Sequence, residues 1–268
     1  MRIGVNAGSI PGSKGLERGR GGSVDETAEL MVEAALGHIR ILEELDFHQI
    51  KVSLKASDVA TNLAANRKFA ALGNRYPLHL GLTEAGPVDT GSIKSALGIG
   101  ILLAEGIGDT IRYSLTADPV EEAKAGRQLL ECLGLRTRKN VDLIACPSCG
   151  RAEIDVIAVA NQAMEAFGER EIPLQVAVMG CVVNGPGEGM HADIGIAGGK
   201  HKGALFKSGK VVASLPEAEL IDILIAELRA VAAEDAELLA AGKPLPVGLG
   251  DGVAAPEPAR PLTPLPVV

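Results

Sequence analysis

Short apolar segments alternate with longer segments of helical periodicity over residues 1–135. Arg2–Asn6 has the pattern of a strand, and apolar residues then recur at helical spacing over Val24–Leu45. Further strands are predicted at His48–Leu54, Leu78–Thr83 and Thr110–Leu115, with helices in the intervals. This repeated order of strand and helix implies an α/β unit with parallel strands and right-handed crossovers, either a barrel or an open sheet.

Two of these helices carry recognisable start signals. Asp25 and Glu26 lie at the beginning of the first, where acidic side chains favour the helix dipole. Asp118, Pro119 and Glu121 supply an N-cap acid, a proline at the first helical position and a glutamate three residues after the cap.

A second unit is predicted over residues 136–241, starting at the basic stretch Arg136–Lys139. Its predicted elements are strands at Val141–Ala145 and Leu174–Met179, a helix over Glu153–Phe167, a short hairpin around Phe206–Val212 and a helix over Pro216–Ala233. Residues 242–268 are rich in proline, glycine and alanine without periodicity, so they are expected to form a disordered tail.

Composition narrows the class of protein. The 268 residues are 47% hydrophobic, which is ample for a buried core, and their formal net charge is −8 with 2% aromatic residues. Nucleic-acid surfaces need a basic field and stacking platforms, so that class of partner is excluded. No run of about 18 apolar residues and no basic-then-apolar leader is present, so the protein is expected to be cytoplasmic and to have no membrane partner.

Three cysteines and a carboxylate lie in two short loops. Cys146 and Cys149 follow one predicted strand, and Cys181 and Glu188 follow the next. Four such ligands suit an iron–sulfur cluster or a tetrahedral zinc, and loops at the carboxyl ends of parallel strands can meet. The first pair alone could be half of a zinc ribbon or a redox pair, but Cys181 lacks a second cysteine at ribbon spacing. Cys132, within a leucine-rich helix, is expected to be a buried apolar residue.

Polar residues recur at the strands of the first unit in a way that a core does not require. They are Arg2 and Asn6 on the first strand, Lys51, Ser53 and Lys55 on the second, Glu84 at the end of the third, and Arg112 and Ser114 on the fourth. His79 lies on the third strand before Glu84, where it can face the interior of a barrel. Alternate residues of a strand share a face, and cations at the mouth of a parallel barrel suit a phosphorylated substrate. The alternative is a structural lysine–glutamate ion pair inside the barrel, in which the two charges neutralise each other and bind no substrate.

Six segments resemble one enzyme family in order along the chain. They are RIGVNAGS, KVSLKASD, LHLGLTEAG, GIGDTIRYSLTADPVEE, ACPSCGR and GCVVNGPGE, and they resemble the 4-hydroxy-3-methylbut-2-enyl diphosphate synthases of non-mevalonate isoprenoid biosynthesis. The resemblance covers Arg2 to about Ala233. It implies a (β/α)8 TIM-type barrel joined to a small α+β domain that holds a [4Fe–4S] cluster.

The resemblance also implies roles for individual residues. The implied cluster ligands are Cys146, Cys149, Cys181 and Glu188, and the implied substrate site contains Arg2, Asn6, Lys55, Glu84, Arg112, Ser114 and Asn184, with Lys51 less certain than Lys55. Glu84 is a candidate proton donor to a departing hydroxyl. Glu188 is a weaker, harder ligand than cysteine, and it can give way to substrate oxygen on one iron.

The implied reaction is the reductive opening and dehydroxylation of 2-C-methyl-D-erythritol 2,4-cyclodiphosphate to 4-hydroxy-3-methylbut-2-enyl diphosphate. It requires two electrons, which the resemblance assigns to flavodoxin or ferredoxin. The resemblance further implies a homodimer in which the cluster of one subunit caps the barrel of the other.

The number of strand–helix units departs from the family pattern. A (β/α)8 barrel has eight strands in about 250 residues, yet only four such units precede the cysteine loops here. The resemblance matches them to strands five to eight, so residues 1–135 are expected to be the C-terminal half of the barrel, in a fragment or a sequence from a truncated gene model. The alternative function is therefore an inactive fragment that only binds a cluster or zinc.

Overall fold

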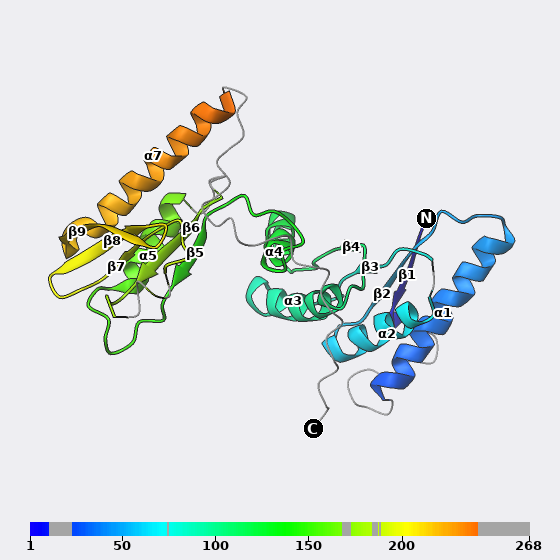
Figure 1. The fold of residues 1–268 in the computed structure, drawn as a ribbon. Coiled ribbons are helices and arrows are strands. Elements are labelled where there is room, and N and C mark those ends of the chain that lie inside the picture. Colours follow the sequence, from blue (N-terminus) through cyan, green and yellow to red (C-terminus); the bar gives the residue numbers. More distant parts are fainter. Residues whose placement is uncertain (11–22, 74, 168–172, 184–186, 188, 241–268) are drawn as a thin grey trace. The chain divides into compact units, whose positions relative to one another are not determined.

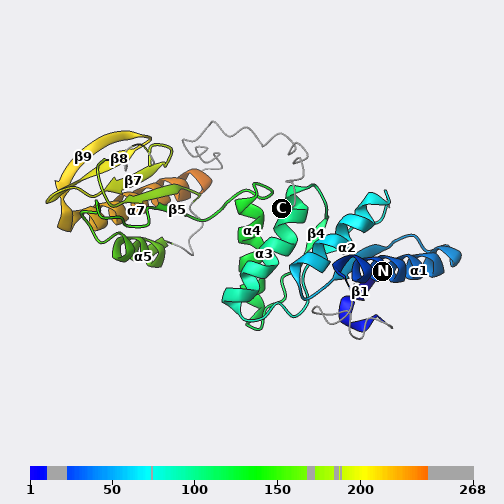
Figure 2. The same cartoon turned by 90° about the horizontal axis from the view of Figure 1, so that it is seen from below.

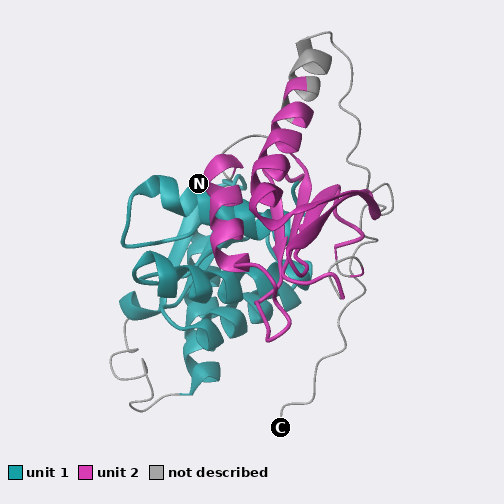
Figure 3. Cartoon of the chain, turned by 90° about the vertical axis from the view of Figure 1, so that its left-hand side faces the viewer, with its two compact units in different colours: residues 1–136, 256–268 teal, residues 137–255 magenta. Residues whose placement is uncertain are grey.

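The computed structural model describes residues 1–10, 23–73, 75–167, 173–183, 187 and 189–240. The chain divides into two compact units between Arg136 and Thr137 (Figure 3). Each unit has its own buried core, and each is described by itself. Among the helices in these ranges, none has the length and apolar character needed to cross a membrane. The predicted tail, 242–268, lies outside the described residues.

Unit 1 consists of parallel strands joined by helices (Figure 1). Its elements are β1 (Arg2–Asn6), η1 (Ala7–Ser9), α1 (Val24–Glu44), β2 (Lys51–Lys55), α2 (Val59–Ala71), β3 (His79–Leu80), α3 (Val88–Ala104), β4 (Thr110–Ile111) and α4 (Pro119–Cys132). Strand β1 pairs with β2 and β3 pairs with β4, both in parallel. A parallel bridge between Val52 and Leu78 joins the two pairs, so the spatial order follows the chain order. The predicted parallel α/β arrangement is confirmed.

Strand alternation gives unit 1 two different faces. Ile3, Val5, Val52, Leu54 and Leu80 are buried and belong to the core that includes residues of α1, α2 and α3. The residues between them point to the opposite side of the strands, because successive side chains of a strand alternate. That opposite side carries the polar residues singled out in the sequence.

Side-chain caps fix where two of the helices begin. The Ser23 side chain accepts from the Glu26 backbone N–H while the Glu26 carboxylate accepts from the Ser23 N–H, which is a reciprocal capping box at the start of α1. Asp118 caps α4 by accepting from the Val120 N–H at 2.8 Å, with Pro119 as the first helical residue. Both predicted helix starts are confirmed.

Strand β1 has the predicted bounds, but the other three strands of unit 1 are shorter than predicted. Strand β2 begins at Lys51 rather than His48, because the Ile50 N–H bonds to the His48 carbonyl at 2.9 Å in a local turn. Strand β3 has two residues, and the N–H of Leu78 before it bonds to the Asp109 carboxylate at 2.8 Å instead of to a neighbouring strand. Strand β4 also has two residues.

Unit 2 is a five-stranded sheet with two helices packed on one face (Figure 2). Its elements are β5 (Asp142–Ala145), α5 (Val156–Phe167), β6 (Gln175–Met179), β7 (Ile194–Ala197), β8 (Lys202–Lys207), β9 (Lys210–Pro216), η3 (Glu217–Glu219) and α7 (Leu220–Ala240). The sheet order is β5-β6-β7-β8-β9. The pairs β5–β6 and β6–β7 are parallel, and β7–β8 and β8–β9 are antiparallel. The predicted hairpin is β8–β9, with longer strands than predicted.

The bounds of two helices and the burial of Cys132 also differ from the sequence prediction. Helix α5 begins at Val156 rather than Glu153, because Asp155 caps it by accepting from the Ala158 N–H at 3.0 Å. Helix α7 begins at Leu220 because β9 and a short 3-10 turn occupy the preceding residues. Cys132 is exposed as the last residue of α4, so the prediction that it is buried was wrong.

Candidate functional site

The polar face of unit 1 is the side of β1–β4 turned away from the helical core. We define it by the residues Arg2, Asn6, Lys51, Ser53, Lys55, His79, Thr110 and Arg112. Arg2 is the register partner of Lys51, and Asn6 is the partner of Lys55. His79 is the partner of Thr110. The strand pairing therefore gathers residues from distant parts of the chain on one face.

The two ends of this face are distinct. Asn6 and Lys55 are the last residues of β1 and β2, whereas Arg2 and Lys51 are the first. Four strand residues span about 13 Å at about 3.3 Å per residue. Arg2 therefore lies at the amino end of the polar face and Asn6 at the carboxyl end, although both side chains point to the same side of β1. In parallel α/β folds, ligands bind at the carboxyl ends of the strands, where Asn6 and Lys55 lie.

Lys55 is the most perturbed cation of the polar face. Its side chain is 9% exposed and has no hydrogen bond or ion pair within the described ranges. Burial, followed by the positive charges of Arg112 and Arg2, lowers the pKa of Lys55 from 10.5 to about 8, against the opposing effect of Glu122. A bound anion such as a phosphate would compensate the buried charge.

Gly81 makes room for Lys55. A Cβ added at this glycine would lie 3.1 Å from both Cε and Nζ of Lys55 and 2.6 Å from the Arg112 carbonyl oxygen. Any larger residue would press on the lysine and on the backbone of the next strand. The absence of a side chain at this position therefore permits the arrangement of the cations.

His79 lies in the middle of the polar face and is buried. Its Nδ1 is 2.7 Å from the Thr110 hydroxyl, and its backbone carbonyl accepts a hydrogen bond from the Ser53 hydroxyl at 3.0 Å. Burial, together with Lys55 first among the nearby cations, lowers the pKa of His79 from 6.5 to about 4. The imidazole is therefore neutral at about pH 7.

Arg112, Ser114 and Glu84 lie beyond the strands on connecting segments. The Arg112 Nε is 3.6 Å from a carboxylate oxygen of Glu122, whose other oxygen accepts from the Leu115 N–H at 2.9 Å. Ser114 is half-buried. Glu84 is exposed, with a backbone φ of 53° in the left-handed region. Residues other than glycine rarely adopt that conformation, and those that do cluster at functional sites.

The cysteine loops of unit 2 follow the adjacent parallel strands β5 and β6. The Cys146 N–H bonds to the Val178 carbonyl at 3.2 Å, and the Gly180 N–H donates to the Cys146 Sγ at 3.2 Å. Cys146 therefore contacts the residue directly before Cys181. Gly180 itself has no space for a side chain, because a Cβ would lie 2.8 Å from the Val156 side chain. The two loops meet, as the sequence predicted.

Cys149 lies in a tight turn of the first loop. Ser148 before it has a φ of 56°, and the Ala152 N–H bonds to the Cys149 carbonyl at 2.9 Å. Hydrogen bonds from the backbone and then from the side chain of Arg151 lower the pKa of the exposed Cys149 thiol. A thiol that ionises readily is suited to bind metal, since the thiolate is the ligand.

The fit of these loops to an iron–sulfur cluster rests on their donor chemistry. Three thiols on two touching loops, one with a depressed pKa and one receiving a backbone N–H, suit the ligand set and the hydrogen bonding of such clusters. Within the described ranges, no three histidine, cysteine or acidic residues are gathered closely enough to hold a metal. The predicted site residues Asn184 and Glu188 lie outside the described residues.

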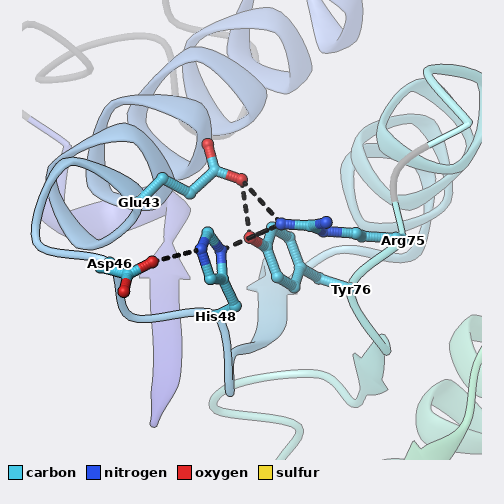
Figure 4. Close-up of polar contacts among 5 residues, drawn as sticks. All are labelled: Glu43, Asp46, His48, Arg75 and Tyr76. Atoms are coloured by element: carbon cyan, nitrogen blue, oxygen red, sulfur yellow. Dashed lines mark hydrogen bonds and ion pairs between the residues drawn. The ribbon is translucent and has the colours of Figure 1, made fainter.

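A second polar cluster lies beside the amino ends of the strands (Figure 4). His48 contacts the Asp46 carboxylate at 3.2 Å and accepts from Arg75 at 3.0 Å, and the Tyr76 hydroxyl donates to Glu43 at 2.6 Å. The cluster adjoins a cavity of about 520 Å³ that Arg2 and Lys51 also line. These contacts hold α1 to the segment before β3, which makes the cluster structural.

Sequence reasoning missed several contributors to the polar face. Local patterns do not single out Gly81, Thr110 or Glu122, and they place His79 on its strand without a partner. Thr110, Glu122 and His79 act through contacts between different elements, and Gly81 acts because it has no side chain. Neither property can be recognised from the periodicity of apolar residues along the chain. Asp118 signals the helix on which Glu122 lies, but not the direction of the Glu122 side chain.

Comparison with known proteins identifies two family domains in the chain. Residues 1–127 match the model of the GcpE TIM-barrel domain, and residues 142–230 match the model of the GcpE protein C-terminal domain. Curated relatives named 4-hydroxy-3-methylbut-2-en-1-yl diphosphate synthase (flavodoxin) are similar to most of the chain. The protein of Geobacter sulfurreducens is 54% identical over 87% of this chain and 64% of its own length.

Two further relatives of the same name give similar values. The protein of Bacillus cytotoxicus is 51% identical over 88% of this chain and 62% of its own length. That of Leifsonia xyli subsp. xyli is 48% identical over 92% of this chain and 63% of its own length. The chain thus spans less than two thirds of the length of each of these relatives.

Proposed function

Because the chain belongs to the GcpE family, we propose that it carries the C-terminal half of the barrel and the cluster-binding domain of a 4-hydroxy-3-methylbut-2-en-1-yl diphosphate synthase. The proposed reaction is the reductive opening and dehydroxylation of 2-C-methyl-D-erythritol 2,4-cyclodiphosphate. The proposal rests on one buried cation in unit 1 and on the cysteine loops of unit 2. Lys55 is a buried cation without a partner among the described residues, and three cysteines lie on two touching loops. The family match supports the presence of both features in one enzyme.

The polar face supplies the groups that bind a diphosphate. Lys55 is positioned to donate to phosphate oxygens, and Arg112 can do so with two parallel N–H groups once it leaves Glu122. Asn6 is the register partner of Lys55, so its amide lies beside the same anion. Arg2 adds positive charge from the amino end of the face. Ser114 is proposed as a further donor to the substrate.

Glu84 is proposed to deliver the proton that the reaction consumes. Opening the cyclic diphosphate while a hydroxyl departs takes two electrons, and the hydroxyl leaves as water only when it is protonated. Glu84 is exposed and held in an unusual backbone conformation shortly after β3, near the carboxyl end of the strand. A carboxylic acid at that place can protonate the leaving oxygen.

The cysteine loops are proposed to hold a [4Fe–4S] cluster through Cys146, Cys149 and Cys181, with Glu188 as the fourth ligand. When bound, such a cluster supplies electrons one at a time and an iron that acts as a Lewis acid. The Gly180 N–H, already on the Cys146 sulfur, would stabilise negative charge on it. Asn184 is proposed as a further substrate contact on the family resemblance alone.

The test is anaerobic purification followed by reconstitution with iron and sulfide. We expect a brown protein with acid-labile sulfide. Cys146→Ser, Cys149→Ser and Cys181→Ser should each lose the cluster, whereas Glu188→Ala should keep part of it with turnover greatly reduced, because three cysteines can still hold the cubane. A protein that binds zinc without labile sulfide would instead support a metal-stabilised binding module. A colourless Glu188→Ala variant beside a coloured Cys181→Ser variant would contradict the assignment.

Turnover is measured with reduced flavodoxin, which the names of the relatives favour over ferredoxin as the donor. We further propose a cytoplasmic homodimer, for which sedimentation analysis of the reconstituted protein reports the oligomeric state. A reconstituted, cluster-bearing chain that fails to turn over the cyclic diphosphate would favour the alternative of a cluster-binding fragment.

A further inference from the structure

His79 is a buried titratable residue to which the proposed reaction gives no role. The Ser53 hydroxyl fixes its backbone, and the Thr110 hydroxyl fixes its ring through Nδ1. Its Nε2 is buried and has no hydrogen-bond partner among the residues that the structure describes. Leaving a buried polar atom unpaired is unfavourable, so a partner is expected in some state of the protein.

The charges around His79 determine which nitrogen carries the proton. A neutral imidazole has one N–H and one lone pair. Lys55, Arg2, Lys51 and Arg112 all act on this ring as positive charges, and a lone pair directed toward cations is favoured over an N–H. The charges therefore favour the tautomer in which Nδ1–H donates to the Thr110 hydroxyl and Nε2 carries the lone pair.

Lys55 is the nearest candidate donor to that lone pair. The bridge between Val52 and Leu78 sets the register of β2 and β3, so His79 and Lys55 are diagonal neighbours on adjacent strands. Such neighbours are about 7–8 Å apart at the backbone, which is within reach of a long side chain. The Lys55 Nζ already lies over β3, 3.1 Å from the place where a Cβ of Gly81 would be.

The Nε2 of His79 and the ammonium of Lys55 both lack a hydrogen-bond partner within the described ranges. Gly81 is two residues beyond His79, so its missing side chain and the imidazole lie on the same side of the strand. The lysine side chain and the imidazole therefore lie on the same side of adjacent strands, where a different rotamer of the lysine is the change that the contact would require.

We propose that His79 is a positioning residue for Lys55, whose ammonium donates a hydrogen bond to the Nε2 lone pair, and that Thr110 holds the ring in the tautomer that this contact requires. The contact keeps the lysine charged and directed along the polar face, where it can meet a phosphate oxygen. The identity of that anion rests on the proposed function, but the contact between the two residues does not.

The other charged groups around the pair enter the design of the test. They are Arg2 on β1, Lys51 on β2, Arg112 after β4 and Glu122 on α4. None of them is changed in the variants, so their effect on Lys55 stays constant. His79→Gln places an amide oxygen near the position of Nε2, whereas the shorter side chain of His79→Asn keeps polarity near Nδ1 only.

The experiment measures the pKa of Lys55 in the full chain by NMR with labelled lysine. A hydrogen bond to the ammonium favours the charged form, so His79→Asn should lower the pKa of Lys55 by about one unit, and His79→Gln should restore it. Equal pKa values in wild type and His79→Asn would overturn the proposal. In the wild type, imidazole ¹⁵N shifts should show a protonated Nδ1, and a protonated Nε2 would overturn it even if a variant fails to fold.

Binding of inorganic pyrophosphate, measured by calorimetry, separates this proposal from the proposed function. We expect binding to weaken about tenfold in His79→Asn and to recover in His79→Gln. Absence of pyrophosphate binding to the wild type would count against a diphosphate site on this face. The pKa of Lys55 would still decide the role of His79 in that case.

Discussion

Lys55 combines burial with the absence of a partner among the described residues, and this makes stability depend on pH. Its pKa is about 8 in the folded chain and 10.5 in the unfolded reference, so the unfolded chain binds more protons between these values. Stability should therefore rise with pH from about 8 to 10.5, and the cost of the buried charge should be fully present below about pH 8.

Lys55→Met removes that cost. We expect this variant to be more stable than wild type at about pH 7 by about 1 kcal/mol, after allowance for screening by solvent. Urea denaturation at several pH values measures the difference, which should shrink as the pH approaches 10.5. Lys51→Met, at an exposed position on the same strand, is the matched control and should show no such trend. A difference that does not vary with pH would contradict the assignment of the shift to Lys55.

At the scale of residues, the sequence predicted which side chains share a face but not their environment. Alternation alone relates Lys51, Ser53 and Lys55, and the structure confirms this. The burial of Lys55 and the contact of His79 with Thr110 depend on strand pairing between residues far apart in sequence. Local periodicity holds no information on such pairing.

At the scale of elements, the capping box of α1 provides a direct test of local sequence. Ser23→Ala removes the acceptor of the Glu26 N–H and should cost about 1 kcal/mol of stability. Ser23→Asp keeps an acceptor at the cap and should cost much less. Thermal unfolding measures both variants, and equal losses in the two would show that the cap contributes nothing specific.

Long elements were predicted well and short ones poorly. Helix α1 spans 21 residues, so its periodic signal exceeds that of the flanking loops. Strand β7 was not predicted, because Gly195 interrupts a strand of only 4 residues. A Cβ at Gly195 would lie 2.4 Å from the Phe206 ring, so the glycine is required by packing against β8. That requirement appears only after the sheet is assembled.

At the scale of the whole molecule, the two units have separate hydrophobic cores, so a core substitution in one unit should destabilise that unit and not the other. Phe69 is 1% exposed in the core of unit 1, and Phe167 is 1% exposed in that of unit 2. Replacing either by alanine should cost about 3–5 kcal/mol by leaving a cavity. Hydrogen exchange followed by mass spectrometry should show the loss of protection in the unit that carries the substitution. Equal losses in both units from either substitution would mean that the chain unfolds as one body.

The chemistry of each unit stays a prediction from the sequence. Cationic residues at strand ends and cysteines in loops can be identified directly from the amino-acid sequence, and the family resemblance implies their roles. The cations gather although the chain as a whole has a net charge of −8. The sequence does not show how strongly each group is perturbed, because that depends on burial and on neighbours from other elements.

The turn around Cys149 has a consequence for handling the protein in air. A thiol that is exposed and ionises readily is susceptible to oxidation to a sulfenic acid, and further oxidation to sulfinic acid is irreversible. The hydrogen bonds from Arg151 that suit this sulfur to its proposed role as a metal ligand thus also make the metal-free thiol sensitive to oxidation. We therefore expect a metal-free preparation kept in air to bind less iron on reconstitution than one kept under anaerobic conditions.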